Sequence, residues 1–284
     1  MIAFLGTGLL GGNFVRALRR RGEQVQAWNR TPEKARALRS DGAVACESPA
    51  AAVSGAARVH LALSDDAAVD EVLEQAFPGL SPGSAIVDHT TTSPAGTAAR
   101  AARWTARGFA FQHAPVFMGP VNALEGTGLM LASGDRGRFD ALAPALEKMT
   151  GRLAWVGPQA ERAAGLKLVG NLFLMAMTTG LIDALALARA VGIPPAEAGA
   201  LFDLFNPGAS VPQRVKRILA ADWSHPSWEL VMARKDARLM LEAAAAGGVA
   251  LALLPTTAEA MDAALARGEA HSDWTVLAKG RVGE

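Results

Sequence analysis

The sequence predicts an α/β protein in which a doubly wound parallel sheet is followed by an all-helical region. Short apolar runs alternate with helical patterns through the first half of the 284 residues. Beyond about residue 158 the strand-like runs stop, and helical periodicity follows. Alternating strands and helices are typical of a parallel sheet with helices on both faces. We therefore expect a sheet domain at residues 1–159 and a helical domain at residues 160–284.

The expected strands are short apolar segments bounded by polar residues or glycine, at residues 2–5, 24–28, 59–63, 85–88, 109–113, 129–133 and 153–156. Helices in this half are expected to begin at Thr31, Ser48 and Ser93, where a capping residue precedes proline. In the second half we expect helices near 160–191, 195–204, 209–221, 228–247 and 255–267. The first of these would be roughly 45 Å long, so we expect it to cross between domains or to pack on a second subunit.

Composition narrows the functional classes. Hydrophobic residues make up 50% and charged residues 19%, which favours a large core over disorder. A net charge of +1 without a basic stripe disfavours nucleic-acid binding. The stretch from Leu168 to Ile182 is too short for a membrane span and contains Asn171, so we expect a buried core helix and no membrane contact. The single cysteine, Cys46, and the lack of a basic segment at the N-terminus favour a cytoplasmic protein.

The residue types that are absent also restrict the chemistry. The chain has no tyrosine, which excludes reductase mechanisms that need a tyrosine general acid. One cysteine and five scattered histidines make a catalytic zinc improbable, so no metal is expected.

A glycine-rich turn follows the first strand. The segment "IAFLGTGLLGG" places Gly6, Gly8 and Gly11 in a G-x-G-x-x-G pattern, with Leu9 and Leu10 opening the next helix. The first glycine permits a tight turn, the second lets a pyrophosphate approach the backbone, and the third allows close packing of helix on strand. An ordinary glycine-rich turn is the alternative, but the strand and helix on either side favour dinucleotide binding.

The end of the second strand distinguishes the two nicotinamide cofactors. An acidic residue there would accept the ribose 2′-hydroxyl of NAD, but the sequence has Asn29, Arg30 and Thr31. A guanidinium and a hydroxyl can hold a 2′-phosphate, so we expect NADP(H). The missing acid also argues against FAD. Alternatively, Arg30 is a solvated charge and Thr31 only a helix cap.

A cation stands in the apolar stretch "GLKLVGNLFLMAMTTGLIDAL" at residues 165–185. Lys167 has no acidic residue within a helical turn, and burying an unpaired ammonium is costly. Asn171 lies four residues on, and therefore on the same helical face. In isolation this pair would be a lysine that reaches solvent and an asparagine that caps a neighbour.

Several motifs together resemble the β-hydroxyacid dehydrogenase family, which includes 3-hydroxyisobutyrate dehydrogenases and glyoxylate/succinic semialdehyde reductases. They are "FLGTGLLGG", "WNRTPEKARAL", "VDHTTTSP", "APV", "GLKLVGN" and "KDARL", and they run over nearly the whole chain. "WNRTPEK" is more similar to the NADPH-using reductases. The resemblance implies a Rossmann domain joined by a long helix to an all-helical domain, in a homodimer or homotetramer.

The resemblance also implies roles for particular residues. Lys167 matches the catalytic lysine and Asn171 a substrate-orienting partner. Leu63, Ser64, Thr90 and Thr91 match positions that line the nicotinamide, and Thr91 is counted with the catalytic residues. Lys235 and Asp236 match a pair that reaches the cofactor and the mouth of the site, and Trp228 an aromatic over the substrate.

The chemistry that follows is proton exchange by Lys167. Desolvation lowers the pKa of a lysine toward neutrality. The ammonium would donate a proton to a carbonyl oxygen during hydride transfer, and the neutral amine would take it back in the reverse direction.

The sequence departs from the family after "APV". Where the family commonly has Ser-Gly-Gly, this chain has Phe117, Met118 and Gly119. Either the backbone amides there still bind a substrate carboxylate, or the pocket has changed toward an apolar or uncharged substrate. The sequence leaves both open. His113 stands at a position that is acidic in the family, and we expect His89 and His113 to make local hydrogen bonds.

The function predicted is an NADPH-dependent reductase that interconverts a small aldehyde or keto acid and a hydroxyacid. One alternative is an imine reductase of the same architecture. Such sites usually have aspartate or tyrosine where Lys167 stands, but the change at Phe117 and Met118 keeps this alternative open. The other is a non-catalytic NADP-binding module, which the joint presence of Lys167, Asn171 and Thr91 disfavours.

Overall fold

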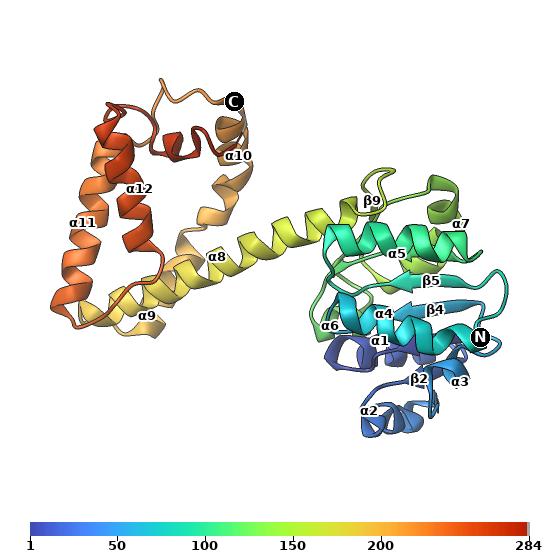
Figure 1. Ribbon diagram of the computed structural model, residues 1–284. Helices are drawn as coiled ribbons and strands as arrows, with labels where there is room; N and C mark the ends of the chain where they lie inside the picture. Colours follow the sequence, from blue (N-terminus) through green and yellow to red (C-terminus); the bar gives the residue numbers. More distant parts are fainter. Residues whose placement is uncertain (283–284) are drawn as a thin grey trace. The chain divides into compact units, whose positions relative to one another are not determined.

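The computed structural model describes residues 1–282, and its contacts divide the chain into two compact units (Figure 1). The first unit is Met1–Asn171, and the second begins at Leu172. The division lies within helix α8, Arg162–Ala190, whereas the predicted domain boundary falls just before that helix.

The first unit contains a parallel sheet of six strands in the order β3-β2-β1-β4-β5-β6. The strands are β1 Ile2–Leu5, β2 Val25–Trp28, β3 Val44–Ala45, β4 Arg58–Leu61, β5 Ala85–Asp88 and β6 Ala110–His113. This order is that of the Rossmann fold, so the predicted fold class is confirmed. Strand β3 was not predicted, because two residues are too short to show a pattern.

A second sheet of three strands completes this unit, in the order β7-β8-β9. Its strands are β7 Val116–Phe117, β8 Leu129–Ala132 and β9 Arg152–Trp155, and β7 runs antiparallel to β8. The sequence predicted β8 and β9 but not β7, so it did not show that Phe117 is paired in a sheet.

Both faces of the six-stranded sheet are covered because its strand residues alternate between two cores. In β1, Ile2 and Phe4 join the core beneath α1, whereas Ala3 and Leu5 join the opposite core. Figure 1 shows α4 and α5 beside strands β4 and β5. The helices of this unit are α1 Leu9–Arg20, α2 Pro32–Arg36, α3 Pro49–Val53, α4 Asp66–Ala76, α5 Pro94–Ala106, α6 Pro120–Glu125 and α7 Arg136–Leu146, with 3₁₀ turns Ala37–Asp41, Phe77–Gly79 and Glu147–Met149.

The second unit is helical, as predicted. Its helices after α8 are α9 Pro195–Leu204, α10 Val211–Ala220, α11 Leu230–Ala246 and α12 Leu254–Ala266, with 3₁₀ turns Pro207–Ser210 and Trp274–Ala278. Helices α11 and α12 share a small core that contains Leu230, Ala233 and Met261. The carboxylate of Asp183 in α8 accepts hydrogen bonds of 2.8 Å from the backbone N–H groups of Ala252 and Leu253, where α12 begins.

The expectation that Leu168 to Ile182 is a buried core helix was wrong for the single chain. Large apolar side chains along this part of α8 are exposed, among them Val169 at 65% and Leu172 at 70%. Among the described residues, α8 alone is long and apolar enough to cross a membrane, judged by length and composition. The sequence pattern established an apolar helix but not what covers it.

Candidate active site

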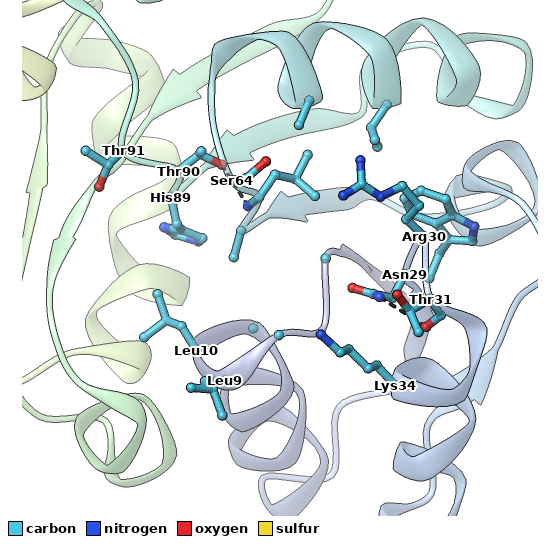
Figure 2. A pocket seen from close by; sticks show the side chains of 18 of the residues that line it. Leu9, Leu10, Asn29, Arg30, Thr31, Lys34, Ser64, His89, Thr90 and Thr91 are labelled. Carbon is cyan, nitrogen blue, oxygen red and sulfur yellow. Dashed lines mark hydrogen bonds between the residues drawn. The ribbon is translucent and has the colours of Figure 1, made fainter.

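A cavity of about 590 Å³ lies at the carboxyl ends of the parallel strands and is lined by residues of the first unit (Figure 2). Ligands of doubly wound sheets bind at this edge. The lining includes the residues after β1, β2, β4 and β5 and the side chain of Lys167. Of the predicted cofactor and nicotinamide residues, it contains Gly6, Gly8, Leu9, Leu10, Gly11, Asn29, Arg30, Thr31, Leu63, Ser64, Thr90 and Thr91.

The three glycines of the turn have different surroundings. Gly6 has a φ of +94°, and a Cβ there would lie 2.3 Å from the carbonyl oxygen of Ala62. A Cβ on Gly11 would lie 2.0 Å from the carbonyl oxygen of Gly6. A Cβ on Gly8 would meet no atom within 4 Å. Gly6 and Gly11 are therefore needed for the fold, whereas Gly8 leaves open space for a ligand at the start of α1.

The end of α1 that faces the cavity is suited to an anion. No acidic side chain lies in its first turn, and its N-cap residue, Gly8, has no side chain to cap the helix. Free backbone N–H groups and the helix dipole favour negative charge there. These features fit the pyrophosphate of a dinucleotide.

The nucleotide end of the cavity contains two cations. Figure 2 shows the side chains of Arg30 and Lys34 extending toward the space above the glycine turn. Asn29 has a structural role, since its Oδ1 accepts from the Thr7 N–H at 2.9 Å and its Nδ2 donates to the Thr31 carbonyl at 3.1 Å. Two cations, with no acidic residue at positions 29–31, fit a 2′-phosphate. Lys34 was missed, because Arg30 lies before α2 and no helical spacing relates the two residues.

The opposite end of the cavity is organised by the loops after β4 and β5. The backbone N–H of Leu63 donates to Thr90 Oγ1 at 3.0 Å, and the N–H of Thr90 donates to Asp88 Oδ1 at 2.9 Å. The hydroxyl of Thr90 thus joins the two loops. In Figure 2 Thr90 and Thr91 lie at the end of the view opposite Arg30 and Lys34.

His89 also lines the cavity and belongs to a buried chain of hydrogen bonds. Arg58 Nε donates to His60 Nε2 at 2.7 Å, His60 Nδ1 lies 2.9 Å from His89 Nε2, and His89 Nδ1 lies 2.7 Å from the Ala114 carbonyl oxygen. Burial lowers the pKa of His89 to about 4 and the pKa of His60 well below its usual value. Both rings are therefore neutral near pH 7, and local hydrogen bonding of His89 is confirmed.

The prediction that His113 makes local hydrogen bonds was wrong. Its ring is buried and its Nδ1 lies 3.5 Å from Asp88 Oδ2, but neither ring nitrogen makes a hydrogen bond in the described part of the chain.

Lys167 is buried on the cavity wall, with 9% of its surface exposed. Its Nζ donates to Asn171 Oδ1 at 2.9 Å and lies 4.2 Å from the centroid of the Phe117 ring. No carboxylate among the described residues is within salt-bridge distance of this amine, and burial lowers the pKa of Lys167. The structure thus brings Lys167 and Asn171 together as predicted and adds Phe117 as a third partner.

The segment after β7 is more constrained than its sequence suggested. Phe117 is the last residue of β7, and Met118 follows it. The cavity is lined by Val116 and Met118. The N–H of Gly119 already donates to Asn122 Oδ1 at 2.9 Å. At Gly119, therefore, the proposal that the backbone amides remain free for a carboxylate does not hold.

Three predicted site residues lie in the second unit. Trp228 is 38% exposed and packs edge-on against Trp274, with ring centroids 6.0 Å apart. Lys235 and Asp236 form a salt bridge of 2.8 Å. Both residues lie inside α11, Leu230–Ala246. Their roles stay predictions.

Sequence reasoning missed the part of the cavity wall supplied by α4. Ala68, Glu71, Val72 and Gln75 line the cavity, as do Trp28 and Val116. The spacing of the α4 residues indicates one helical face. That face could have been recognised only by knowing that α4 lies beside the carboxyl end of β4.

Two family models match the chain. The NAD-binding domain of 6-phosphogluconate dehydrogenase matches residues 1–157, and the NAD-binding region of NADP-dependent 3-hydroxyisobutyrate dehydrogenase matches residues 162–280.

Individual proteins are also similar. The cytokine-like nuclear factor N-PAC of Homo sapiens is 30% identical over 84% of this chain, and the chain spans 44% of the length of that relative. The 3-sulfolactaldehyde reductase of Escherichia coli K12 is 27% identical over 97% of this chain and 94% of its own. Among solved structures, an imine reductase from Myxococcus stipitatus in complex with NADP+ has a TM-score of 0.91 at 20% identity, covering 98% of each chain. At this identity the likeness shows the fold alone.

Proposed function

Because the chain belongs to the NAD(P)-binding dehydrogenase family of 6-phosphogluconate and 3-hydroxyisobutyrate dehydrogenases, we propose that it is an NADPH-dependent reductase of a small aldehyde or keto compound. The observation that carries this proposal is a buried, unpaired amine on the wall of a dinucleotide-sized cavity. Within residues 1–282 Lys167 has no carboxylate partner, and the glycine turn opens onto the same cavity. A similar reductase of 3-sulfolactaldehyde supports the reaction class.

In the proposed mechanism Lys167 is the proton donor. The glycine turn at residues 6–11 and Arg30 would hold NADPH, whose nicotinamide would be the source of the hydride that reaches the carbonyl carbon. The Lys167 ammonium donates a proton to the carbonyl oxygen and stabilises the charge that develops there. Asn171 holds the amine through the hydrogen bond to its Oδ1. The lowered pKa of Lys167 makes proton release less costly than from an exposed lysine.

The preference for NADPH over NADH is part of the proposal. Arg30 and Lys34 line the nucleotide end, and no acidic residue follows β2 at positions 29–31. A 2′-phosphate would accept charge-assisted hydrogen bonds from these side chains.

Imine reduction is the second candidate function. An apolar ring beside Lys167 favours it, because Phe117 supplies no hydroxyl to a carboxylated substrate. The presence of lysine instead of an acidic group favours carbonyl reduction.

We further propose that the protein forms a homodimer or homotetramer. The exposed apolar surface of α8, which includes Phe173 at 52% and Met175 at 66%, is of a kind that soluble proteins rarely leave uncovered. Light scattering during size-exclusion chromatography would measure the subunit number, and a monomer at micromolar concentration would reject this assembly.

The function is tested by NADPH oxidation with glyoxylate, succinic semialdehyde, methylmalonate semialdehyde, tartronate semialdehyde and cyclic imines, repeated with NADH. We expect turnover with at least one carbonyl compound and its loss in Lys167→Ala. Lys216→Ala, at an exposed lysine of α10, is the matched control and should keep turnover. Tight NADPH binding without turnover on any compound would favour a non-catalytic module.

A further inference from the structure

Phe117 occupies the space next to the reactive amine. The centroid of its ring lies 4.2 Å from Lys167 Nζ. The ring also packs against α8 at Gly170, where a Cβ would lie 2.3 Å from the ring Cζ and 2.5 Å from Cε1. The side chain is therefore held between the amine and a glycine one turn of helix away. At this distance the ring face attracts the ammonium.

These contacts use most of the hydrogen-bonding capacity of Lys167. An ammonium has three N–H donors and no acceptor. One donates to Asn171 Oδ1 at 2.9 Å, and the ring face of Phe117 covers another side. The remaining N–H group of the ammonium can donate to one oxygen atom. If Lys167 serves the carbonyl oxygen, it has no donor left for a carboxylate on the same substrate.

The segment that follows Phe117 does not replace that donor. The N–H of Gly119 donates to Asn122 Oδ1, and Asn122 Nδ2 donates to Thr127 Oγ1 at 3.0 Å. Met118 offers a thioether, which is not a donor. The other cations among the described lining residues, Arg30 and Lys34, stand at the nucleotide end. A carboxylate buried here would meet only neutral partners, such as the hydroxyls of Ser64 and Thr91, and burying its charge without a second cation is costly.

We propose that Phe117 makes this site selective for uncharged carbonyl compounds, in which an apolar substituent and not a carboxylate packs against its ring. The inference rests on the proposed reductase function and narrows its substrate class. The ring contributes an apolar surface of the kind that binds an alkyl or aryl substituent. Phe117 thus acts as a specificity-determining residue beside the catalytic amine.

The test is a set of related aldehydes that differ chiefly in charge at the end remote from the reacting C=O. Turnover with NADPH is measured for succinic semialdehyde, its uncharged methyl ester and butanal. We expect kcat/KM for the uncharged compounds to exceed that of the acid by at least about tenfold, the scale of one desolvated charge–dipole contact. A value of kcat/KM that is higher for the acid would overturn the proposal.

Two variants test whether the selectivity comes from the apolar side chain at position 117. Phe117→Ser combined with Met118→Gly restores a hydroxyl and space, and should shift the ratio of kcat/KM toward the acid by about tenfold or more. Phe117→Leu keeps the position apolar and should keep the preference for uncharged compounds. If Phe117→Leu shifts the ratio as far as the double variant does, the apolar character of position 117 is not the determinant.

A binding measurement separates this inference from the reductase function. Calorimetric titration of the NADP+ complex compares isobutyramide with isobutyrate, which have nearly the same shape but different charge. Tighter binding of the amide supports the inference even if no carbonyl compound is turned over, an outcome that would reject only the reductase function. Tighter binding of the carboxylate, or binding of neither, counts against the inference whatever the turnover.

Discussion

The two ends of the cavity are built from different kinds of group. The nucleotide end, beside the glycine turn, has the open Cβ position of Gly8 and the cationic side chains of Arg30 and Lys34. The opposite end, where we propose that the reaction occurs (the reaction end), has a buried amine held between Asn171 and Phe117. The first end is built from residues close in sequence, and the second joins residues 117 and 167. Substitutions at the two ends should therefore change different quantities.

The largest expected effect is at Lys167. Lys167→Met should lower kcat by about 10³-fold, within the range for a general acid, with little change in the Kd of NADPH. The same substitution should not lower the Tm of the protein. Because burial lowers the pKa of Lys167, the ammonium costs stability below that pKa, and an apolar side chain removes the cost. Stopped-flow turnover and calorimetry measure the two effects. A Tm that falls by more than about 4 °C would show that the amine stabilises the fold.

The glycine turn offers a matched pair for the nucleotide end. Gly8→Ala should fold normally but weaken NADPH binding by about 100-fold or more, because its Cβ would enter the space left for the pyrophosphate. Gly11→Ala should instead reduce the yield of folded protein, since its Cβ would overlap the Gly6 carbonyl oxygen. Fluorescence titration and circular dichroism distinguish these outcomes. Equal NADPH affinity in Gly8→Ala and the natural protein would contradict this position for the cofactor.

Arg30 tests the choice of cofactor. Arg30→Ala should reduce the ratio of kcat/KM for NADPH over NADH by about 10- to 100-fold, the worth of a hydrogen bond to a charged group. Lys34→Ala should reduce it less, because an ammonium is a point charge without the planar fork of arginine. The ratio is measured at fixed ionic strength. If neither substitution changes it, another group binds the 2′-phosphate.

Gly170 tests the packing that holds the Phe117 ring. Gly170→Ala should destabilise the protein by about 1–3 kcal/mol, because its Cβ would overlap the ring. Gly165→Ala in the same helix is the control. A Cβ there meets nothing within 4 Å, so higher helix propensity should stabilise by about 0.5–1 kcal/mol. Urea unfolding measures both. A stabilising Gly170→Ala would show that the ring is free to move away.

The histidine pair beside the reaction end should make stability sensitive to acid. His60 and His89 have lowered pKa values in the folded protein, so the unfolded chain binds more protons below pH 6.5. The free energy of unfolding should therefore fall as pH decreases from 6.5 toward about 4, by up to about 1.4 kcal/mol per pH unit for each histidine.

Urea unfolding at stepped pH values measures this slope. His89→Gln should reduce the slope, whereas His225→Gln, at an exposed position, should not. A free energy of unfolding that rises on acidification through this window would exclude neutral buried rings.

Much of the first unit could be predicted from sequence because its signals are local. The seven predicted strands are present, and the family resemblance is confirmed by models covering residues 1–157 and 162–280. The roles of Gly6, Gly8 and Gly11 follow from one turn of chain. The pairing of Lys167 with Asn171 follows from helical spacing.

Tertiary structure decided what depends on contacts between distant segments. The Phe117 ring reaches Lys167 because β7 pairs with β8 and faces α8, and no spacing in the sequence encodes that approach. The cavity wall supplied by α4 and the exposed apolar side chains of α8 also depend on how distant segments pack. Sequence periodicity shows which side of an element is apolar or polar, since the backbone fixes that direction. It does not show which element, or which second chain, lies against that side, because this depends on how the whole chain packs.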